Sequence, residues 1–78
     1  MSGQTTDSTV DARGATCPGP LMDLIAEIRA VDEGSVVGLL SDNDRTPDEV
    51  SEWADETGHD VTGVHDEGDH YRIEVRKG

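Results

Sequence analysis

Apolar residues recur at helical spacing in two stretches of the chain. In the first stretch, the positions i, i+3, i+4 and i+7 of one helix face are occupied by Leu21, Leu24, Ile25 and Ile28. This spacing predicts a helix from about Pro18 to Val31 that stops near Gly34. Prolines in its first turn break no hydrogen bond, because the first N–H groups of a helix have no partner within it.

The second helical stretch has a stronger start signal. Thr46-Pro47-Asp48-Glu49 has the form of a capping box with proline at its first helical position. The residues expected to face the core follow at helical spacing, and they are Val50, Trp53, Ala54 and Thr57. Gly58 comes directly after them, and glycine commonly ends helices. The sequence therefore predicts a second helix over about 46–57.

Four other stretches have strand patterns, and they are Thr9–Ala12, Val36–Leu40, Val61–Val64 and Tyr71–Val75. The second of these is a continuous apolar run, which is typical of a strand covered on both faces. The last alternates apolar and polar residues, which predicts an amphipathic strand. Polar turns are expected at Arg13-Gly14, Asp42–Arg45 and Asp66–Asp69.

The predicted order of elements is βαβαββ. It indicates an α/β (α+β) fold: a two-layer sandwich in which both helices cover one face of a four-stranded mixed sheet. The chain has 78 residues, which is enough for one small core. We expect residues 1–8 to form a flexible leader and residues 9–78 to form a single domain.

Charge restricts the possible partners. Eighteen acidic residues against six basic ones give a net charge of −12. Such a surface repels nucleic acid and anionic membranes, so we expect no direct nucleic-acid binding. It suits high salt, which screens self-repulsion, and this predicts a halophilic source. No apolar stretch is long enough to span a bilayer, and residues 1–8 lack the features of a secretory signal. We therefore expect a cytoplasmic protein without membrane insertion.

The only cysteine of the chain lies just before the first predicted helix, in Ala15-Thr16-Cys17-Pro18-Gly19-Pro20-Leu21. The unpaired N–H groups and the positive dipole at a helix N-terminus stabilise a thiolate, which is the reactive form of cysteine. Pro18 and Pro20 fix the backbone after the sulfur. A buried structural cysteine is the alternative. A lone cysteine forms no internal disulfide and lacks the Cys-x-x-Cys pair of thioredoxin-like redox proteins.

The neighbours of Cys17 have predicted supporting roles. Arg13 either stabilises the thiolate, contacts a donor protein or is simply solvated. Asp11 is expected to brace the loop by accepting backbone N–H bonds. Gly14 and Gly19 are expected to allow special backbone geometry or close approach of a partner. Thr16 caps the helix or hydrogen-bonds near the sulfur.

No cofactor or metal is expected. The spacing of His59, His65 and His70 matches no compact zinc pattern, so we interpret these histidines as surface or partly packed residues. Trp53 and Tyr71 are interpreted as core or core-edge residues. The acidic turns are interpreted as solvated, although either could meet a basic partner.

The segment Asp11-Ala12-Arg13-Gly14-Ala15-Thr16-Cys17-Pro18-Gly19-Pro20-Leu21-Met22 resembles the signature of the TusA/SirA-like sulfur-carrier family, which centres on a Cys-Pro-x-Pro box. The resemblance continues through Ser41-Asp42, Gly58–Val61 and Ile73–Lys77. The chain departs from the family at Asp42–Arg45, where proline often follows an acidic pair. This departure puts a partner-specific role of that loop in doubt.

The resemblance implies a carrier that holds sulfane sulfur as a persulfide on Cys17. It implies a cysteine desulfurase or another persulfide donor, and downstream sulfur-relay or acceptor proteins. The outlets known in the family are tRNA thiolation, molybdenum-cofactor synthesis and dissimilatory sulfur metabolism, and the sequence selects none of them. Two other functions stay open: a non-covalent regulatory or interaction module, and a peroxide-sensing thiol.

Overall fold

The four strands and two helices follow one another in the predicted order βαβαββ. The structure is a computed structural model that describes residues 6–14 and 19–78. Its elements are β1 (Ser8–Asp11), α1 (Gly19–Ala30), β2 (Val36–Ser41), α2 (Thr46–Thr57), β3 (Asp60–Asp66) and β4 (Tyr71–Arg76). Most predicted bounds hold to within one or two residues. The predicted start of the first helix at Pro18 lies outside the described residues.

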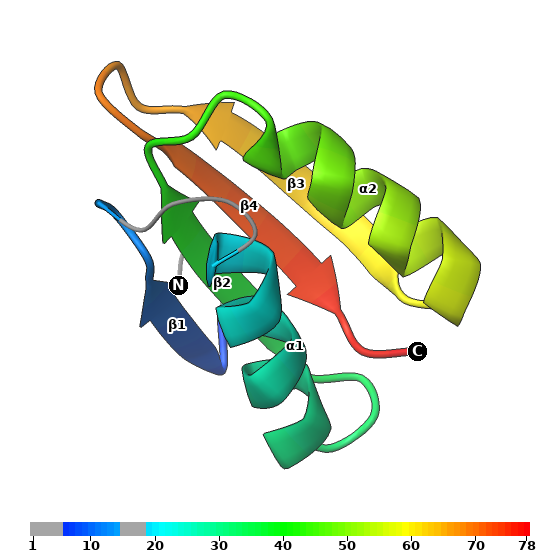
Figure 1. Cartoon of the computed structure of the whole chain (residues 1–78). Helices are drawn as coiled ribbons and strands as arrows, with labels where there is room; N and C mark the ends of the chain where they lie inside the picture. Colours follow the sequence, from blue (N-terminus) through cyan, green and yellow to red (C-terminus); the bar gives the residue numbers. More distant parts are fainter. Residues whose placement is uncertain (1–5, 15–18) are drawn as a thin grey trace.

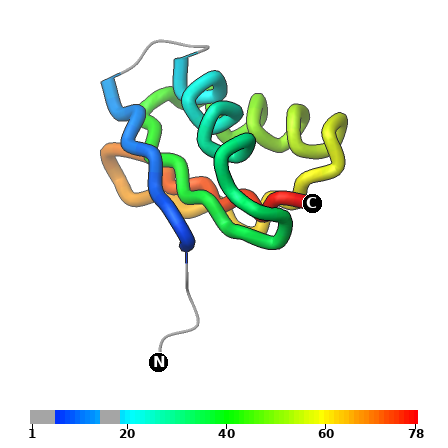
Figure 2. The backbone as a smooth tube through the Cα atoms, turned by 90° about the horizontal axis from the view of Figure 1, so that it is seen from below, coloured from blue at the N-terminus to red at the C-terminus, as the bar shows by residue number. Residues whose placement is uncertain are grey.

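The sheet is mixed, with the strand order β1-β2-β4-β3. β1 runs parallel to β2, while β4 is antiparallel to both β2 and β3. Both helices lie on the same face of this sheet, and no helix formed by residues 6–14 or 19–78 covers the other face (Figures 1 and 2). The prediction of a two-layer sandwich is confirmed.

The core lies between the helices and the sheet. Alternate residues of the two central strands point into it, and α1 and α2 cover them. The buried apolar side chains are Ala12, Leu24, Ile28, Val37, Leu39, Val50, Ala54, Ile73 and Val75. Trp53 and Tyr71 are half-buried and pack against this cluster, so the interpretation as core-edge residues is confirmed.

The prediction that β2 is covered on both faces is wrong in one respect. Val37 and Leu39 are fully buried on the helix side, but Val36 and Leu40 are only half-buried on the open side. The open side of β2 is covered by small neighbouring side chains instead of a second helical layer. A Cβ atom at Gly38 would lie 3.4 Å from Thr6 Cγ2.

The capping box at the start of α2 has a different role from the one predicted. Thr46 is the first residue of the helix, and the flanking residue is Arg45, whose side chain makes no capping hydrogen bond. The Thr46 hydroxyl pairs with Ser41 Oγ at 2.8 Å. Helix α2 ends at Gly58 as predicted, since Gly58 adopts a left-handed conformation with φ of +81°. The prediction that Thr57 faces the core is wrong, because its side chain is exposed in the last turn.

The C-terminal hairpin is longer than predicted. β3 extends from Asp60 to Asp66 in place of the predicted Val61–Val64, with a bulge between Val61 and Gly63. Asp66 therefore ends the strand, and the turn spans residues 67–70, closed by a 2.9 Å hydrogen bond from Glu67 N to His70 O.

One residue of β4 breaks the predicted alternation. Ile73 and Val75 are buried beneath the helices as expected, but Glu74, which points to the open face, is also only 2 % exposed. Its carboxylate lies over Gly63, where a Cβ atom would be 2.9 Å from Glu74 Oε1. His65 and Arg72 lie beside the two carboxylate oxygens at 3.3 and 3.4 Å.

Candidate functional site

Three connections lie at one end of the sheet. Because β1 and β2 are parallel, the chain leaves both strands there, and the β3–β4 hairpin turns at the same end (Figure 1). We call the described residues 12–14, 42–45 and 67–70 the loop end. Loops that follow the carboxyl ends of parallel strands are common places for binding and catalytic residues.

Asp11 and Arg13 form a double hydrogen bond where the chain leaves β1. Arg13 Nε donates to Asp11 Oδ1 at 2.9 Å, and Arg13 Nη2 donates to Oδ2 at 2.8 Å. Arg13 N also donates to Oδ1 at 3.1 Å, so Asp11 accepts a backbone hydrogen bond at the start of this loop. These hydrogen bonds lower the pKa of Asp11 to about 2 and raise that of Arg13. Both side chains are about half exposed, at 53 % and 47 %.

Gly14 joins the first connection to the second. Its backbone has a φ of +87°, which an L side chain rarely adopts, although a Cβ atom there would meet no other atom within 4 Å. Its conformation, not a lack of space, therefore favours glycine at this position. Gly14 N donates to Asp42 Oδ2 at 2.9 Å, across 28 positions of sequence.

The loop that carries Asp42 is held by a small network of hydrogen bonds that is buried at Ser41 and Thr46. Ser41 Oγ and Thr46 Oγ1 lie 2.8 Å apart, and both residues are fully buried. Asn43 N donates to Ser41 Oγ at 3.2 Å, and Arg45 N donates to Asn43 Oδ1 at 2.9 Å. Both ends of the loop are thereby fixed, because buried hydrogen-bonded groups resist exposure to water.

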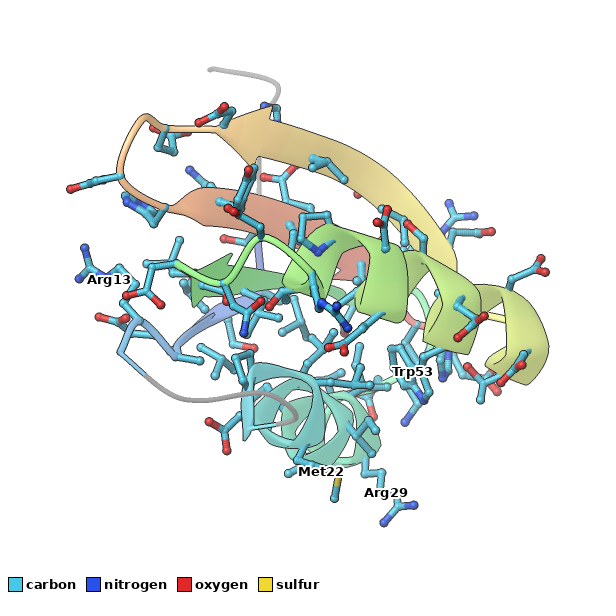
Figure 3. All side chains as sticks on the ribbon, turned by 45° about the horizontal axis from the view of Figure 1, so that its top comes forward. Arg13, Met22, Arg29 and Trp53 are labelled. Atoms are coloured by element: carbon cyan, nitrogen blue, oxygen red, sulfur yellow. The ribbon has the colours of Figure 1, made fainter. Side chains whose placement is uncertain are left out.

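A shallow acidic pocket of about 100 Å³ lies between the second and third connections. Its lining residues are Asp42, Asp44, Asp66, Gly68, Asp69, His70 and Tyr71. Asp42 and Asp69 also help to raise the pKa of Arg13, which lies at this end of the molecule (Figure 3). The four aspartates give the pocket a negative potential, and two of them interact electrostatically with the Arg13 guanidinium.

Polar contacts hold the side chains around the pocket. Tyr71 donates from its hydroxyl to Asp44 Oδ1 at 3.3 Å, and the negative charge of Asp44 raises the pKa of Tyr71. Asp69 Oδ1 lies 2.6 Å from His70 Nδ1, and this hydrogen bond lowers the pKa of Asp69. The acidic residues of both turns are exposed, as predicted, and these polar contacts hold some of their side chains in place.

The residues predicted to form the site are only partly within the described chain. Thr16, Cys17 and Pro18 lie outside it. Gly19 begins α1, and Pro20 is buried in the first turn of that helix, where it breaks no hydrogen bond. The special geometry predicted for glycine is found at Gly14, while the role of Gly19 remains a prediction.

The three histidines have separate local partners. The ring of His59 packs against Trp53 with a centroid distance of 5.0 Å, and its Nδ1 accepts a hydrogen bond from Gly78 N. His65 contacts Glu74, and His70 contacts Asp69. Across 6–14 and 19–78, no three His, Cys, Asp or Glu side chains are grouped so as to hold a metal ion. In the same residues, neither helix is long and apolar enough to cross a bilayer.

Sequence reasoning did not identify the contact between Asp42 and Gly14. The two residues lie in different loops, and no local spacing pattern links positions 28 residues apart. The only signal was the resemblance to a known family at Ser41-Asp42. The burial of Glu74 had no sequence signal either. Glu74 occupies a polar position in the alternating pattern of its strand, so it was expected to face outward.

The fold and the loop end define a class of protein: a small two-layer α/β domain whose connections meet at one end of a mixed sheet. A solved structure of a SirA-like protein from Desulfitobacterium hafniense has this fold, with a TM-score of 0.80. The two chains are 24% identical, and the match covers 91% of this chain and 97% of the other. At this identity the likeness establishes the fold.

Sequence comparison then establishes the family. The family model described as "Sulfurtransferase TusA" matches residues 8–77, so the chain belongs to the TusA family. The chain is 43% identical over 68 residues to a protein of Archaeoglobus fulgidus named "Putative sulfur carrier protein", covering 87% of this chain and 93% of the relative. It is 30% identical over 71 residues to "Sulfur carrier protein TusA" of Pseudomonas entomophila, covering 91% and 89%.

Proposed function

We propose that this protein is a sulfur carrier that accepts sulfane sulfur as a persulfide on Cys17 and relays it to acceptor proteins. Membership of the TusA family over residues 8–77, together with a single cysteine in the sequence, carries this proposal. Two relatives whose whole length is nearly covered are named as sulfur carriers. The donor is a cysteine desulfurase or another protein persulfide, and the carrier works in the cytoplasm.

The proposed reaction is a thiol–persulfide exchange. The Cys17 thiolate attacks the outer sulfur of a donor persulfide, R–S–SH. A new S–S bond forms on Cys17, the donor S–S bond breaks, and the donor leaves as R–S⁻. An acceptor thiolate attacks the outer sulfur of Cys17 in the same way and regenerates the thiolate. No electrons are gained or lost overall, so the cycle needs no added oxidant or reductant.

Two features of the chain favour this chemistry. Cys17 precedes the first residue of α1 by two positions, and a helix N-terminus stabilises a nearby anion. The absence of a second cysteine in the sequence prevents collapse of the persulfide into an internal disulfide. Arg13, Gly14, Pro18, Gly19, Pro20 and Asp11 are proposed to support the site, and the guanidinium of Arg13 is already shared with Asp11.

The proposal is tested by loading the protein with a purified cysteine desulfurase and L-cysteine, followed by intact-mass analysis. We expect an added mass of one sulfur atom that a thiol reductant removes. The matched control is Cys17→Ser, which should gain nothing. Reductant sensitivity is essential, because a sulfinic acid adds nearly the same mass but resists thiols.

The same experiment separates the alternative functions. A non-covalent interaction module would take up no sulfur under any condition. A peroxide-sensing thiol would take up no sulfur from the desulfurase but would form a reducible sulfenic acid with hydrogen peroxide. Absence of the reductant-sensitive sulfur on the wild-type protein with an active desulfurase would contradict the carrier proposal for that donor class. A second arm with a low-molecular-weight persulfide tests loading without protein recognition.

A further inference from the structure

Asp42 connects two loops that are distant in sequence. Its Oδ2 atom accepts a hydrogen bond from Gly14 N at 2.9 Å, and Gly14 lies three positions before Cys17. Among the hydrogen bonds of the described residues, this is the one that ties Arg13 or Gly14 to another loop; the bonds of Arg13 go to Asp11. The orientation of the peptide group between Arg13 and Gly14 therefore depends on Asp42.

The anchor itself is rigid. Asp42 directly follows Ser41, whose hydroxyl is fully buried and bonded to Thr46 at 2.8 Å. On its other side, Asn43 donates its N–H back to Ser41 Oγ. The Asp42 carboxylate is exposed, but its backbone is fixed by neighbours that are held in the core. Because the backbone of Asp42 is fixed relative to β2 and α2, its carboxylate restrains Gly14 in the first connection.

The Gly14 backbone has open space on the side where a side chain would lie. Its φ is +87°, and no described atom beyond its chain neighbours lies within 4 Å of an ideal Cβ position. Glycine also has the largest conformational freedom to lose on ordering. Within the described part of the chain, the charge-assisted hydrogen bond to Asp42 restrains this peptide group.

We propose that Asp42 is a positioning residue for Cys17: by holding the N–H of Gly14, three positions before the cysteine, it influences the reactivity of the thiol. The effect on sulfur transfer rests on the proposed function, whereas the effect on loop geometry and thiol reactivity does not. Residues 42–45 differ from the pattern of the family, but in this proposal their loop still has a role within the molecule, because Asp42 holds Gly14.

The test compares three variants: Asp42→Ala, Asp42→Asn and Asp44→Ala. Alanine removes both the charge and the acceptor, while asparagine removes the charge and keeps an oxygen for Gly14 N. Comparing these two therefore isolates the hydrogen bond from the general effect of a lost negative charge. Asp44→Ala removes a carboxylate from the same loop that contacts Tyr71 instead of Gly14. Because Asp42 is exposed, alanine there leaves no cavity in the core.

Two measurements report on the loop without any sulfur donor. Amide hydrogen exchange at Gly14 should be roughly tenfold faster in Asp42→Ala than in Asp42→Asn, since only the former lacks the acceptor. The rate of Cys17 alkylation by iodoacetamide, measured against pH, should be lower in Asp42→Ala than in Asp42→Asn by roughly threefold or more at pH values below the thiol pKa. In Asp44→Ala, exchange at Gly14 should match the wild type.

A purely structural role of Asp42 would change the melting temperature but not the pH profile of alkylation. Equal Gly14 exchange and equal alkylation profiles in the alanine and asparagine variants would overturn the proposal. Sulfur loading from the desulfurase is then measured on the same proteins. If the two variants differ in thiol reactivity but the wild type accepts no sulfur, the positioning role stands and the carrier function fails. If the wild type accepts sulfur but the alanine and asparagine variants have the same thiol reactivity, the carrier function stands and the positioning role fails.

Discussion

The hydroxyl groups of Ser41 and Thr46 form a hydrogen bond in the core, 2.8 Å long, between two residues with no exposed surface. The bond joins the last residue of β2 to the first residue of α2. The same Ser41 oxygen accepts the N–H of Asn43, so one side chain organises the whole turn that presents Asp42. The sequence predicted that Thr46 caps the helix. In the structure its buried hydroxyl instead bonds to Ser41 and so connects the helical layer to the sheet.

Replacing Ser41 by alanine should destabilise the fold by about 1–3 kcal/mol, because the buried Thr46 hydroxyl and the Asn43 N–H lose a partner. The double variant Ser41→Ala/Thr46→Val should lose less than the sum of the two single changes, since it removes both polar partners. Urea unfolding of the four proteins measures the difference. Thr57→Ala, which removes an exposed hydroxyl, is the control and should stay within about 0.5 kcal/mol of the wild type. Strict additivity would argue against a direct Ser41–Thr46 bond.

Glu74 gives a second prediction about stability. Its carboxylate is almost fully buried between Gly63, His65 and Arg72 on the open face of the sheet. Glu74→Ala leaves a void and deprives the half-buried Arg72 of its charged neighbour, so a loss of about 1–3 kcal/mol is expected in urea unfolding. Glu74→Gln keeps the shape and should lose less. The exposed pair of Arg76 and Asp60 is the comparison, and Asp60→Asn should change stability by at most about 1 kcal/mol. Equal effects of Glu74→Ala and Asp60→Asn would contradict this assignment.

The Asp11–Arg13 pair predicts a specific acid titration. Because the folded pKa of Asp11 is lowered from 3.8 to about 2, its contribution to stability is present above the unfolded value and is lost as the pH falls through about 2. Carboxyl-carbon NMR should show Asp11 titrating with a midpoint near 2 in the wild type. In Arg13→Gln the midpoint should move up toward the ordinary value. A wild-type midpoint close to 4 would mean that the double hydrogen bond is not maintained in solution.

Salt should stabilise the protein. The molecule carries a net charge of −12 within dimensions of 30 × 27 × 18 Å. At an ionic strength of about 0.01 M the screening length is about 30 Å, so nearly all the acidic groups repel one another; at about 1 M it is about 3 Å. The melting temperature should therefore rise with KCl concentration, in line with the proposed halophilic source. A melting temperature that does not depend on salt would count against that source.

The arrangement of the helices and strands was predictable because each depends on local pattern. The repeat of Leu21, Leu24 and Ile28 determines which face of α1 is buried, and Gly58 ends α2 by its own conformational freedom. The errors occurred where a distant partner decides the outcome. Burial on the open side of β2 depends on Thr6 and Thr9.

The contacts in the candidate site also fall into those that local sequence predicts and those that depend on a distant partner. The hydrogen bond from Arg13 N to Asp11 was predictable, because aspartate commonly bonds to the backbone that follows it. The pairing of the Arg13 side chain with Asp11 was not among the predicted roles of Arg13. The bond from Gly14 to Asp42 was not predictable, since it forms only when the sheet brings two connections to the same end. Sequence indicates the reactive residue type, while the assembled sheet determines which side chains orient the loop that leads to it.

Lys77 is the only lysine of the sequence, and its Nζ donates to Val31 O at 2.7 Å, just past the C-terminal end of α1. The helix has 12 residues and a length of about 18 Å, so this amine lies a full helix length from Gly19. Amine-directed tethering through this side chain would attach a surface, dye or affinity handle away from the loop end. Immobilised in this way, the molecule would keep that end turned toward the solution and accessible to a second protein.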